Sequence, residues 1–539
     1  MRETSSIDAF SRNSEARGDI ETTRGEENVF GTTGPATSYF SASGYRQYQR
    51  ETIDGIEDAF DRGKRIVIVE GPTGSGKSHI ANAFARQSNS CHLITAQKIL
   101  QDQYERDFPG MFSMKGRAAY SCTMGDMNDS CMTGPCRRRK GYSNPNCPYR
   151  VAKGRARAAP ITVHNFDSFY YQSSYGGGFA GRKLLIVDEA HNLAPKFTNF
   201  LSFTIHSQGG VVVPEAPRLV DYDAFVQATK NDYQASYEAL QRQYDAVGEL
   251  SREDQYRMDE LGKTLHKMRF YLSEREKDHP AEFVFDYKAL GTYGPSVTFR
   301  PVFVGKFAAR WLYHYGERVI LMSATILDKE MFCREVGVDT DDAHFVQIPS
   351  TFPAKNRAII KKFAGRMGYK YIDTTLPRIV ELVEEIVSKY PDRKGIVQTH
   401  SERIANYLQR NLLDRRFTYN KDFPTPKAML EAHKRKPGSI IVASGLREGV
   451  DLVGELSQIQ IFCKIPYPSI SDKVVARKMD IDPSWYGWAT TLSFVQMLGR
   501  SVRSPTDKAV TYLLDSGFGY FYKKNSRFIP DYVKDAIRR

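Results

Sequence analysis

The chain has 539 residues, of which 41% are hydrophobic and 26% are charged, the balance of an ordinary globular protein. At about 150 residues per domain, this length predicts roughly three or four domains. The longest apolar runs, such as Ile66–Val69, are only as long as a strand, so we expect no membrane contact. Residues 1–40 lack the apolar core of a signal peptide, which favours a cytoplasmic location.

Positive charge is concentrated in one part of the chain. The net charge of +13 favours a polyanionic partner. Residues 111–160 hold ten Lys or Arg against two Asp, whereas residues 196–300 hold 13 basic against 16 acidic side chains. Taken alone, the basic segment fits a contact with nucleic-acid phosphates and a merely solvated face equally well.

The N-terminal half begins with a tail and continues as strands and helices. Residues 1–40 are rich in Ser, Thr, Gly and Glu and are expected to be flexible. A strand at 65–70 is followed by the glycine-rich loop Gly71–Ser78 and then by a helix. Short apolar strands at 92–95 and 183–187 suit a parallel sheet that is covered on both faces.

A helical hairpin is expected beyond residue 195. Apolar and aromatic side chains recur every three or four residues over 233–247 and again over 258–272. The intervening Gly248–Ser251 suits a turn, so the two stripes predict antiparallel helices packed along a seam.

A second α/β lobe is predicted from about residue 350, after an apolar strand that completes the first lobe. Its strands are expected at 395–398, 439–443, 459–463 and 509–514, with helices at 373–390 and 401–412. This alternation predicts a doubly wound parallel sheet. The predicted fold class is therefore α/β, with two parallel-sheet lobes and insertions in the first lobe.

The loop Gly71–Ser78 has the full pattern of a phosphate-binding loop, and it lies between a predicted strand and a predicted helix. Lys77 would reach the terminal phosphates of ATP, and Ser78 would bind Mg²⁺. The backbone N–H groups that would cradle the phosphates belong to Gly71, Thr73, Gly74, Ser75 and Gly76.

Charged residues that suit ATP hydrolysis occur in both lobes. Asp188 follows an apolar strand and is placed to bind Mg²⁺, while Glu189 would orient and deprotonate the attacking water. Arg500 and Arg503 are three residues apart on a predicted helix, hence on one face. They would stabilise the γ-phosphate in the transition state.

Four cysteines separate the phosphate loop from the acidic pair, namely Cys122, Cys131, Cys136 and Cys147. None of their spacings is the Cys-x₂-Cys of many structural zinc sites. Four thiolates suit zinc or a [4Fe–4S] cluster, and the residues alone leave both open. The remaining Cys91, Cys333 and Cys463 adjoin apolar segments and are expected to be buried thiols.

The ordered motifs resemble those of superfamily 2 helicases of the DEAH-box type, in particular the iron–sulfur branch typified by XPD and DinG. Asp188–His191 is the acidic box, and Arg46–Gln49 resembles the adenine-reading motif, which implies nucleotide contacts from Arg46 and Gln49. Thr95–Lys98 falls where the family contacts DNA, and Ser323–Thr325 resembles the motif that couples hydrolysis to movement.

Motifs of the second lobe extend the resemblance. Arg447–Asp451 is similar to the fifth motif, which implies nucleotide contacts from Gly449 and Asp451, although the family often has Trp where Arg447 stands. Lys464–Pro468 is similar to the proline-bearing segment that follows. The sixth motif is matched by Gln496, Gly499, Arg500 and Arg503.

The resemblance implies a domain organisation and favours the [4Fe–4S] cluster over zinc for the four cysteines. The expected domains are a tail at 1–40, first-lobe segments at 41–110, 159–194 and 306–345, an iron–sulfur domain at 111–158, a helical arch at 195–305, and a second lobe at 346–539. A basic face that includes Arg137, Arg138 and Arg139 is expected to oppose the acidic arch and to guide one DNA strand.

The implied activity is that of a monomeric DNA helicase that uses ATP and Mg²⁺, binds single-stranded and forked DNA, and moves 5′ to 3′. The short chain suits a bacterial or phage DinG-like enzyme, which in the latter case would act in the host cytoplasm. Two alternatives stay open: a translocase that remodels protein–DNA complexes without separating strands, and a non-catalytic nucleic-acid-binding module with a degenerate ATP site.

Overall fold

The computed structural model describes residues 34–175, 178–207, 212–213, 221–289, 294–445, 452, 454–504 and 506–538. They form two compact units, which are treated separately below. The first unit comprises Met1–Tyr39, Ala81–Leu321 and Cys333–Asp342, and the second comprises Phe40–Ile80, Met322–Phe332 and Ala343–Arg539. Within the described part of the chain, no helix is both long and apolar enough to cross a membrane.

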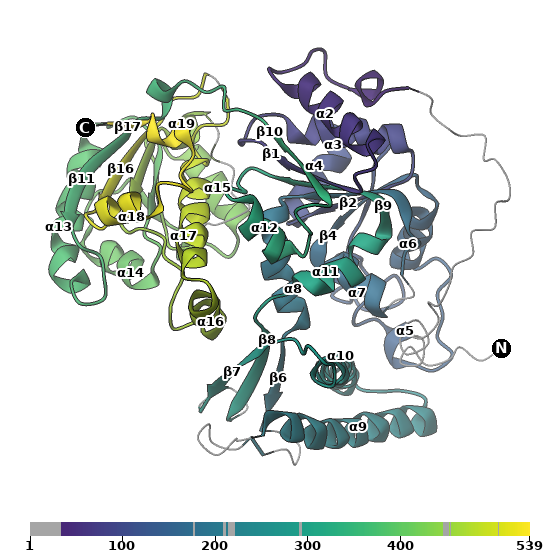
Figure 1. The fold of residues 1–539 in the computed structure, drawn as a ribbon. Coiled ribbons are helices and arrows are strands. Elements are labelled where there is room, and N and C mark those ends of the chain that lie inside the picture. Colours follow the sequence, from purple (N-terminus) through teal and green to yellow (C-terminus); the bar gives the residue numbers. More distant parts are fainter. Residues whose placement is uncertain are drawn as a thin grey trace. The chain divides into compact units, whose positions relative to one another are not determined.

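Two seven-stranded sheets form the framework (Figure 1). The first has the strand order β10-β1-β9-β5-β2-β4-β3. Its strands are β1 (Ile66–Glu70), β2 (Cys91–Thr95), β3 (Phe112–Met114), β4 (Ile161–Asn165), β5 (Arg182–Asp188), β9 (Gly316–Ser323) and β10 (Ala343–Gln347). The boundary between the units falls within β9. The pairs β1–β10, β2–β4, β2–β5 and β3–β4 are all parallel, so the expected parallel sheet is confirmed.

Helices of the first unit follow its strands in chain order. They are α4 (Lys98–Asp107), α5 (Pro135–Arg138), α6 (Pro148–Ala158), α7 (Phe166–Tyr175), α8 (Leu193–Leu201) and α11 (Gly305–Trp311). Helices α3 (Lys77–Ser88) and α12 (Lys329–Val336) each continue from one unit into the other. Residues Leu184–Val187 of β5 are all buried, which explains why their sequence is a continuous apolar run rather than an alternating one.

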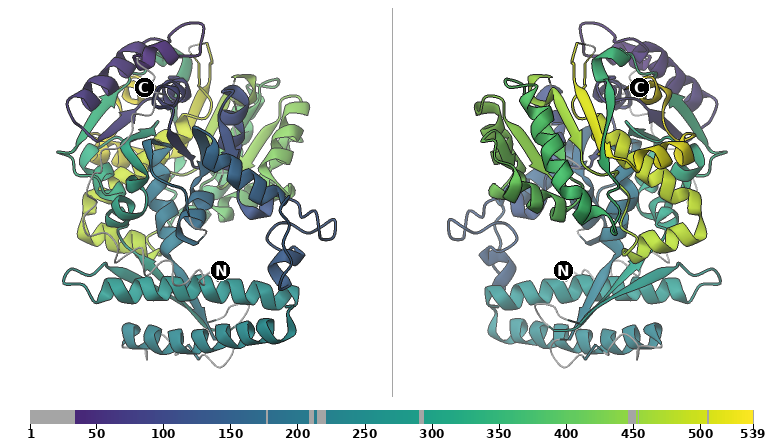
Figure 2. Two further views of the ribbon diagram at one scale, coloured as in Figure 1. Left: turned by 90° about the vertical axis from the view of Figure 1, so that its right-hand side faces the viewer. Right: turned by 90° about the vertical axis from the view of Figure 1, so that its left-hand side faces the viewer.

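The hairpin predicted beyond residue 195 is present as α9 (Tyr222–Val247) and α10 (Arg252–Arg275), which lie alongside each other in Figure 2. Helix α9 ends because Gly248 takes a left-handed conformation with φ of 78°, which glycine adopts without strain. Helix α10 starts with Ser251, whose side chain accepts a hydrogen bond from the Asp254 N–H. The expected turn is therefore confirmed.

The sequence predicts a helical insertion at residues 195–305, but the structure shows that this insertion is only partly helical. It also contains an antiparallel sheet in the order β6-β8-β7, built from Phe203–His206, Ser296–Pro301 and Phe283–Lys288. Phe203 and Phe299 are directly paired across β6 and β8, and their rings stack with centroids 4.7 Å apart. Aromatic packing thus joins the sheet to the hairpin through Tyr271 of α10, whose ring meets that of Phe203.

The second unit contains the sheet β13-β14-β12-β15-β16-β11-β17. Its strands are β11 (Ile359–Gly365), β12 (Gly395–Gln398), β13 (Phe417–Tyr419), β14 (Ile440–Ala443), β15 (Ile459–Phe462), β16 (Val510–Asp515) and β17 (Ile537–Arg538). Its helices are α2 (Gln49–Asp61), α13 (Ile372–Ser388), α14 (Glu402–Asn411), α15 (Pro426–Arg435), α16 (Lys473–Ile481), α17 (Pro483–Leu498), α18 (Phe518–Asn525) and α19 (Asp531–Lys534). The predicted doubly wound sheet is confirmed, with parallel pairing throughout.

Candidate active site and cysteine segment

The glycine-rich loop connects β1 to α3, the context in which such loops bind phosphate. The Lys77 amine is buried and donates a hydrogen bond to the carbonyl of Gly71 at 2.7 Å, so its side chain folds back over the loop. The Ser75 N–H donates to the Pro72 carbonyl at 3.0 Å, which closes the turn. The loop therefore has the curled backbone that presents successive N–H groups to an anion.

Arg46 and Gln49 brace this loop. The Gln49 amide donates to the Gly76 carbonyl at 3.2 Å and its carbonyl accepts from the Arg46 N–H at 2.6 Å. The Arg46 guanidinium donates to the Gly74 carbonyl. A β-carbon on Gly76 would lie 1.9 Å from the Gln49 amide nitrogen, and φ of +85° also favours glycine there. The two residues assigned to adenine recognition thus lie against the phosphate loop.

The acidic pair lies at the carboxyl end of β5 in the first unit. Asp188 is buried, and one of its oxygens accepts a hydrogen bond of 2.8 Å from the hydroxyl of Tyr104 on α4. The other oxygen accepts from the Glu189 N–H at 2.9 Å. Glu189 has φ of 55° and its carboxylate lies 3.3 Å from the His191 ring. Sequence reasoning missed Tyr104, because nothing in the spacing marks it as a partner of Asp188.

Residues of the Ser323–Thr325 motif and of the sixth motif meet within the second unit. The amide of Gln496 on α17 donates to the Thr325 hydroxyl at 3.3 Å. The Thr325 N–H in turn donates to the Ser323 hydroxyl at 3.0 Å. Further along the same connection, the Trp488 indole donates to the Ile326 carbonyl at 2.9 Å. These bonds connect the Ser323–Thr325 segment to α17, as a coupling motif requires.

The prediction that Arg500 and Arg503 share a helix face is wrong. Helix α17 ends at Leu498, with Gly499 as its C-cap, so both arginines follow the helix. Arg500 is nevertheless buried and lines a pocket together with Gln496.

The backbone after α17 lies against the phosphate loop within the same unit. A β-carbon on Gly74 would lie 1.8 Å from the carbonyl oxygen of Arg503. One on Gly499 would lie 3.5 Å from the Thr73 hydroxyl oxygen. Gly449 and Asp451, assigned to nucleotide binding by resemblance, lie outside the described residues.

The cysteine segment, residues 122–147, brings its thiols close to one another. The sulfurs of Cys131 and Cys147 are 3.8 Å apart. A β-carbon on Gly134 would lie 2.5 Å from the sulfur of Cys122. Burial, followed by the charge and hydrogen bond of Cys147 and by the charge of Cys136, raises the pKa of the Cys131 thiol to about 12. All four cysteines are free thiols.

Among the described residues, no group of three or more His, Cys, Asp or Glu side chains is arranged so that it could hold a metal ion. The cysteine segment therefore gathers its thiols without forming a ready set of ligands. Cys91, Cys333 and Cys463 are buried and form no disulfide, as expected from their apolar surroundings.

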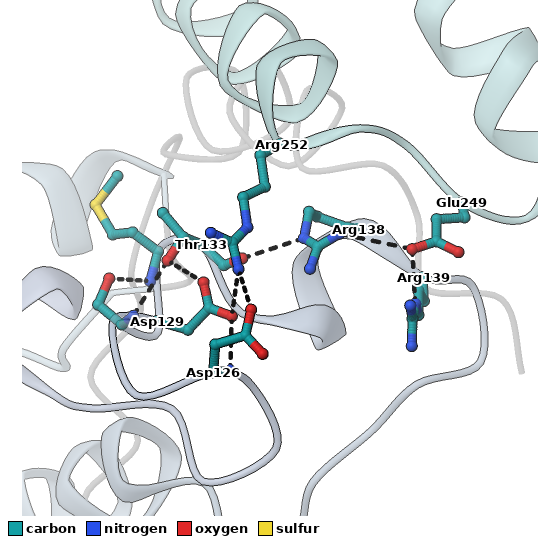
Figure 3. Close-up of polar contacts among 9 residues, drawn as sticks. Asp126, Asp129, Thr133, Arg138, Arg139, Glu249 and Arg252 are labelled. Carbon is teal, nitrogen blue, oxygen red and sulfur yellow. Dashed lines mark hydrogen bonds and ion pairs between the residues drawn. The ribbon is translucent and has the colours of Figure 1, made fainter.

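The hairpin tip, residues 245–252, docks on the cysteine segment (Figure 3). Arg252 lies 2.7 Å from Asp126 and 3.1 Å from Asp129, whose side chain is only 1% exposed. Burial acts to raise the pKa of Asp129, but hydrogen bonds from Thr133 and the Asp126 N–H, with the charges of Arg252 and Arg138, bring that pKa below its ordinary value. Asp129 is therefore ionised at neutral pH and pairs with Arg252 as a carboxylate.

Three consecutive arginines of the cysteine segment also pair with the hairpin. Arg138 and Arg139 lie 3.5 and 2.7 Å from Glu249 (Figure 3). Arg137 lies 2.6 Å from Asp259. These arginines were expected to form an open face that guides DNA. The structure instead places them in ion pairs with the hairpin, because the acidic charge of the insertion reaches them directly.

Two backbone hydrogen bonds complete this tip interface. The Leu250 N–H donates to the Arg138 carbonyl at 2.9 Å, and the Lys140 N–H donates to the Gly248 carbonyl at 2.7 Å. Because backbone bonds fix the register of the two segments, the contact is a specific docking rather than a loose meeting of opposite charges.

Known proteins resemble both parts of the chain. Residues 397–535 match the family model of the helicase C-terminal domain, and residues 43–207 match that of the res subunit of type III restriction enzymes. A curated protein of Methanocaldococcus jannaschii, described as a probable ATP-dependent helicase, is 21% identical over an alignment of 607 positions, which spans 88% of this chain and 92% of that protein.

Solved structures share the fold over nearly the whole chain. An XPD helicase is 15% identical, with a TM-score of 0.65, and the match covers 90% of this chain and 98% of that one. The Xpd4 protein of S. tokodaii is 14% identical, with a TM-score of 0.56, and the match covers 92% and 99%. The matched helicase domains indicate an ATP-hydrolysing helicase, and the likeness to the XPD structures shows a shared fold.

Proposed function

We propose that the protein is a DinG-like DNA helicase that moves along single-stranded DNA 5′ to 3′ and unwinds forked duplexes as a monomer. The observation that carries this proposal is the braced phosphate loop, in which Lys77, Gln49 and Arg46 are already held by the loop carbonyls. A degenerate nucleotide site would not need this bracing. The basic charge and the helicase domains support a nucleic-acid substrate.

ATP hydrolysis is assigned to the residues predicted from the motifs. Lys77 and the loop N–H groups bind the phosphates, while Ser78 and Asp188 bind Mg²⁺. Glu189 accepts a proton from the attacking water and is oriented by His191, 3.3 Å away. Arg500 and Arg503 stabilise the charge that develops on the γ-phosphate. The Gln496–Thr325 hydrogen bond supports a coupling of hydrolysis to movement.

We assign the four cysteines to a [4Fe–4S] cluster. Thiolates are the ligands that such clusters use, and three observations support the fit. Two sulfurs are 3.8 Å apart, Cys122 lies beside Gly134, and Gly134 is two residues before Cys136 in the chain. The cluster would supply a rigid crosslink for a segment that contains only short helices and turns.

Anaerobically purified protein tests the cluster assignment. A broad visible absorption band near about 400 nm, with about four iron atoms per chain, is expected. Cys131→Ser should lose the band, whereas Cys333→Ser, which alters a buried thiol outside the segment, should keep it. If the purified protein is colourless and contains zinc, the iron–sulfur assignment is wrong and the four cysteines bind zinc instead.

A strand-displacement assay with forked DNA tests the activity. Duplexes with a 5′ overhang should be unwound and those with a 3′ overhang should not, and Glu189→Gln should bind ATP without turnover. ATP hydrolysis that is stimulated by single-stranded DNA but separates no duplex would identify a translocase instead. Full activity in Glu189→Gln would remove the assignment of that carboxylate as the base.

A further inference from the structure

An exposed aromatic loop in the second unit has no role in the site described above. It spans Arg366–Tyr371 and connects β11 to α13. Tyr369 is 89% exposed and Tyr371 is 47% exposed. Large aromatic side chains on a protein surface lose apolar burial, so two in one short loop indicate a surface that meets a partner.

The loop is held rigidly beneath these tyrosines. Met367, two residues before Tyr369, is buried in the core of the unit, and its N–H donates to the Asp515 carboxylate at 3.2 Å. The Gly368 carbonyl accepts from the Tyr371 N–H at 2.9 Å, and the Thr375 hydroxyl donates to the Arg366 carbonyl at 2.9 Å. A loop whose backbone is already held binds a partner at a lower entropic cost than a mobile loop.

The charge around the loop identifies the chemistry of the partner. Residues 361–371 contain Lys361, Lys362, Arg366 and Lys370 and no acidic residue. Lys362 pairs with Glu385 at 3.0 Å, and the Arg366 guanidinium lies 5.8 Å from the centroid of the Tyr371 ring. Cations interleaved with aromatic rings are the combination that binds phosphates and stacks bases of a single strand.

The position of the loop at the edge of the sheet agrees with a nucleic-acid partner. It follows the carboxyl end of β11, and Asp515, which anchors it, ends the neighbouring parallel strand β16. Open α/β sheets bind their ligands at this edge. The acidic Asp373 nearby is paired with Arg403, which limits its repulsion of phosphate.

We propose that Tyr369 and Tyr371 form a stacking platform for the bases of single-stranded nucleic acid, with Lys361 and Lys370 at its phosphates. This inference rests on the proposed function and adds to it a base-contacting surface on the second unit. Stacking needs only the face of a base, so the platform is insensitive to sequence. A motor that moves along a strand requires such tolerance.

Fluorescence anisotropy of the full chain with an oligothymidylate of about 20 nucleotides tests the platform. Replacing each tyrosine by alanine should weaken binding about fivefold to 150-fold. Tyr369→Phe with Tyr371→Phe keeps both ring faces and should bind within about twofold of the wild type. Tyr520→Ala removes another exposed tyrosine of the same unit, 67% exposed on α18, and should have no effect.

An abasic oligonucleotide of the same length separates stacking from charge. The wild type should bind the abasic oligonucleotide as weakly as the double alanine variant binds oligothymidylate. On abasic DNA the two alanine substitutions should weaken binding no further. Unchanged binding by the double alanine variant, or an equal loss on abasic DNA, would overturn the platform and leave the helicase assignment intact. A wild-type protein that binds no single strand would overturn both. Unchanged ATP hydrolysis without DNA shows that the variants are folded.

Discussion

The hydroxyl of Tyr104 donates a hydrogen bond to the carboxylate of Asp188 across 2.8 Å, and both side chains are buried. Tyr104 belongs to α4, which begins at Lys98, the last residue of the segment Thr95–Lys98 assigned to DNA contact. Gln101 of the same helix donates to the carbonyls of Met114 and Val163, which fixes α4 on the sheet. The proposed Mg²⁺ ligand is therefore oriented by the helix that follows a proposed DNA contact.

Tyr104→Phe should weaken the use of Mg²⁺ more than the use of ATP. The variant keeps the ring, which packs on Phe108 at 5.6 Å between centroids, and loses only the bond that orients the carboxylate. Loss of a group that orients a metal ligand typically costs about tenfold in metal affinity. We expect the Mg²⁺ concentration for half-maximal ATP hydrolysis to rise about tenfold, while the KM for ATP at saturating Mg²⁺ changes little.

Tyr313→Phe is the matched control, because that buried hydroxyl donates to the Val336 carbonyl at 2.7 Å within the same unit. It should lower stability without changing the Mg²⁺ requirement. Competition between Mn²⁺ and Mg²⁺, followed by the electron paramagnetic resonance of free Mn²⁺, measures binding without turnover. Identical metal affinities in the wild type and Tyr104→Phe would contradict the positioning role.

Gly76→Ala should abolish tight ATP binding. The new β-carbon would lie 1.9 Å from the Gln49 amide, so the loop or its brace must move. Gly63→Ala is a close control: Gly63 has a similar φ of +81°, but nothing lies within 4 Å of its added β-carbon. Both substitutions strain the backbone, and only the first disturbs the phosphate loop.

Equilibrium binding of a fluorescent ATP analogue measures the difference. Gly63→Ala should keep the wild-type affinity although its unfolding free energy falls by about 1 kcal/mol. Gly76→Ala should bind at least about tenfold more weakly, since the N–H groups that face the phosphates are displaced. Equal affinities in the two variants would show that the Gln49 brace does not shape the loop.

The sheet strands were accessible to sequence reasoning because buried parallel strands are continuous apolar runs. Strand β14, for example, was expected at 439–443 and is found at Ile440–Ala443. The sequence did not predict the antiparallel strand β6, because this strand has only four residues and its pairing joins Thr204 to the distant Thr298. The end of α17 was also misplaced, since Gly499 was interpreted as a motif residue rather than a helix end.

The candidate site also contains some residues that motif spacing predicts and some contacts that it does not. Motif spacing identified the phosphate loop and the acidic pair, whose chemistry depends on neighbours in the chain. Tyr104 and Asp188 are 84 positions apart and Arg139 and Glu249 are 110 apart, so no local pattern predicts that they meet. Such contacts depend on how the sheet and the insertion fold. The spacing of residues in a single sequence does not predict this.

Arg252→Glu should release the hairpin tip from the cysteine segment. An exposed ion pair contributes only about 0–1 kcal/mol, but Asp129 is buried and would face a second carboxylate in this variant. We expect the Leu250 and Lys140 N–H groups, which bond across the tip interface, to exchange with deuterium faster. High salt should speed exchange in the wild type in the same direction.

Arg242→Glu is the control for a change of charge on the hairpin. Arg242 is 4.0 Å from Glu238 on the same helix and is 73% exposed. Its replacement should leave exchange at Leu250 and Lys140 unchanged. Protection of these two N–H groups in Arg252→Glu at the wild-type level would show that the backbone bonds alone hold the tip.

Acid should destabilise the first unit through two buried histidines. His92 lies within β2, where its ring contacts the Thr162 hydroxyl at 2.9 Å and the Ala180 carbonyl at 3.0 Å. Burial, and then the charge of Arg182, lowers the pKa of His92 to about 3. Burial with the charges of His92 and Arg182 also places the pKa of His164 well below its ordinary value.

The direction in which pH changes stability follows from the lowered pKa of both histidines. Below pH 6.5 the unfolded chain protonates both histidines, whereas the folded chain keeps His92 neutral until about pH 3. Stability is therefore complete above pH 6.5 and falls as the pH drops from 6.5 towards 3. Between pH 7.5 and 5.5 the loss should be about 1.4 kcal/mol for each histidine.

Urea unfolding at pH 7.5, 6.5 and 5.5 measures this loss. Gln replaces the imidazole with a neutral donor and acceptor, so the His92→Gln and His164→Gln double variant should lose most of the pH dependence, whatever its stability at pH 7.5. His279→Gln changes an exposed histidine of the first unit, and should keep it. A double variant with the wild-type slope would assign the acid sensitivity to other groups.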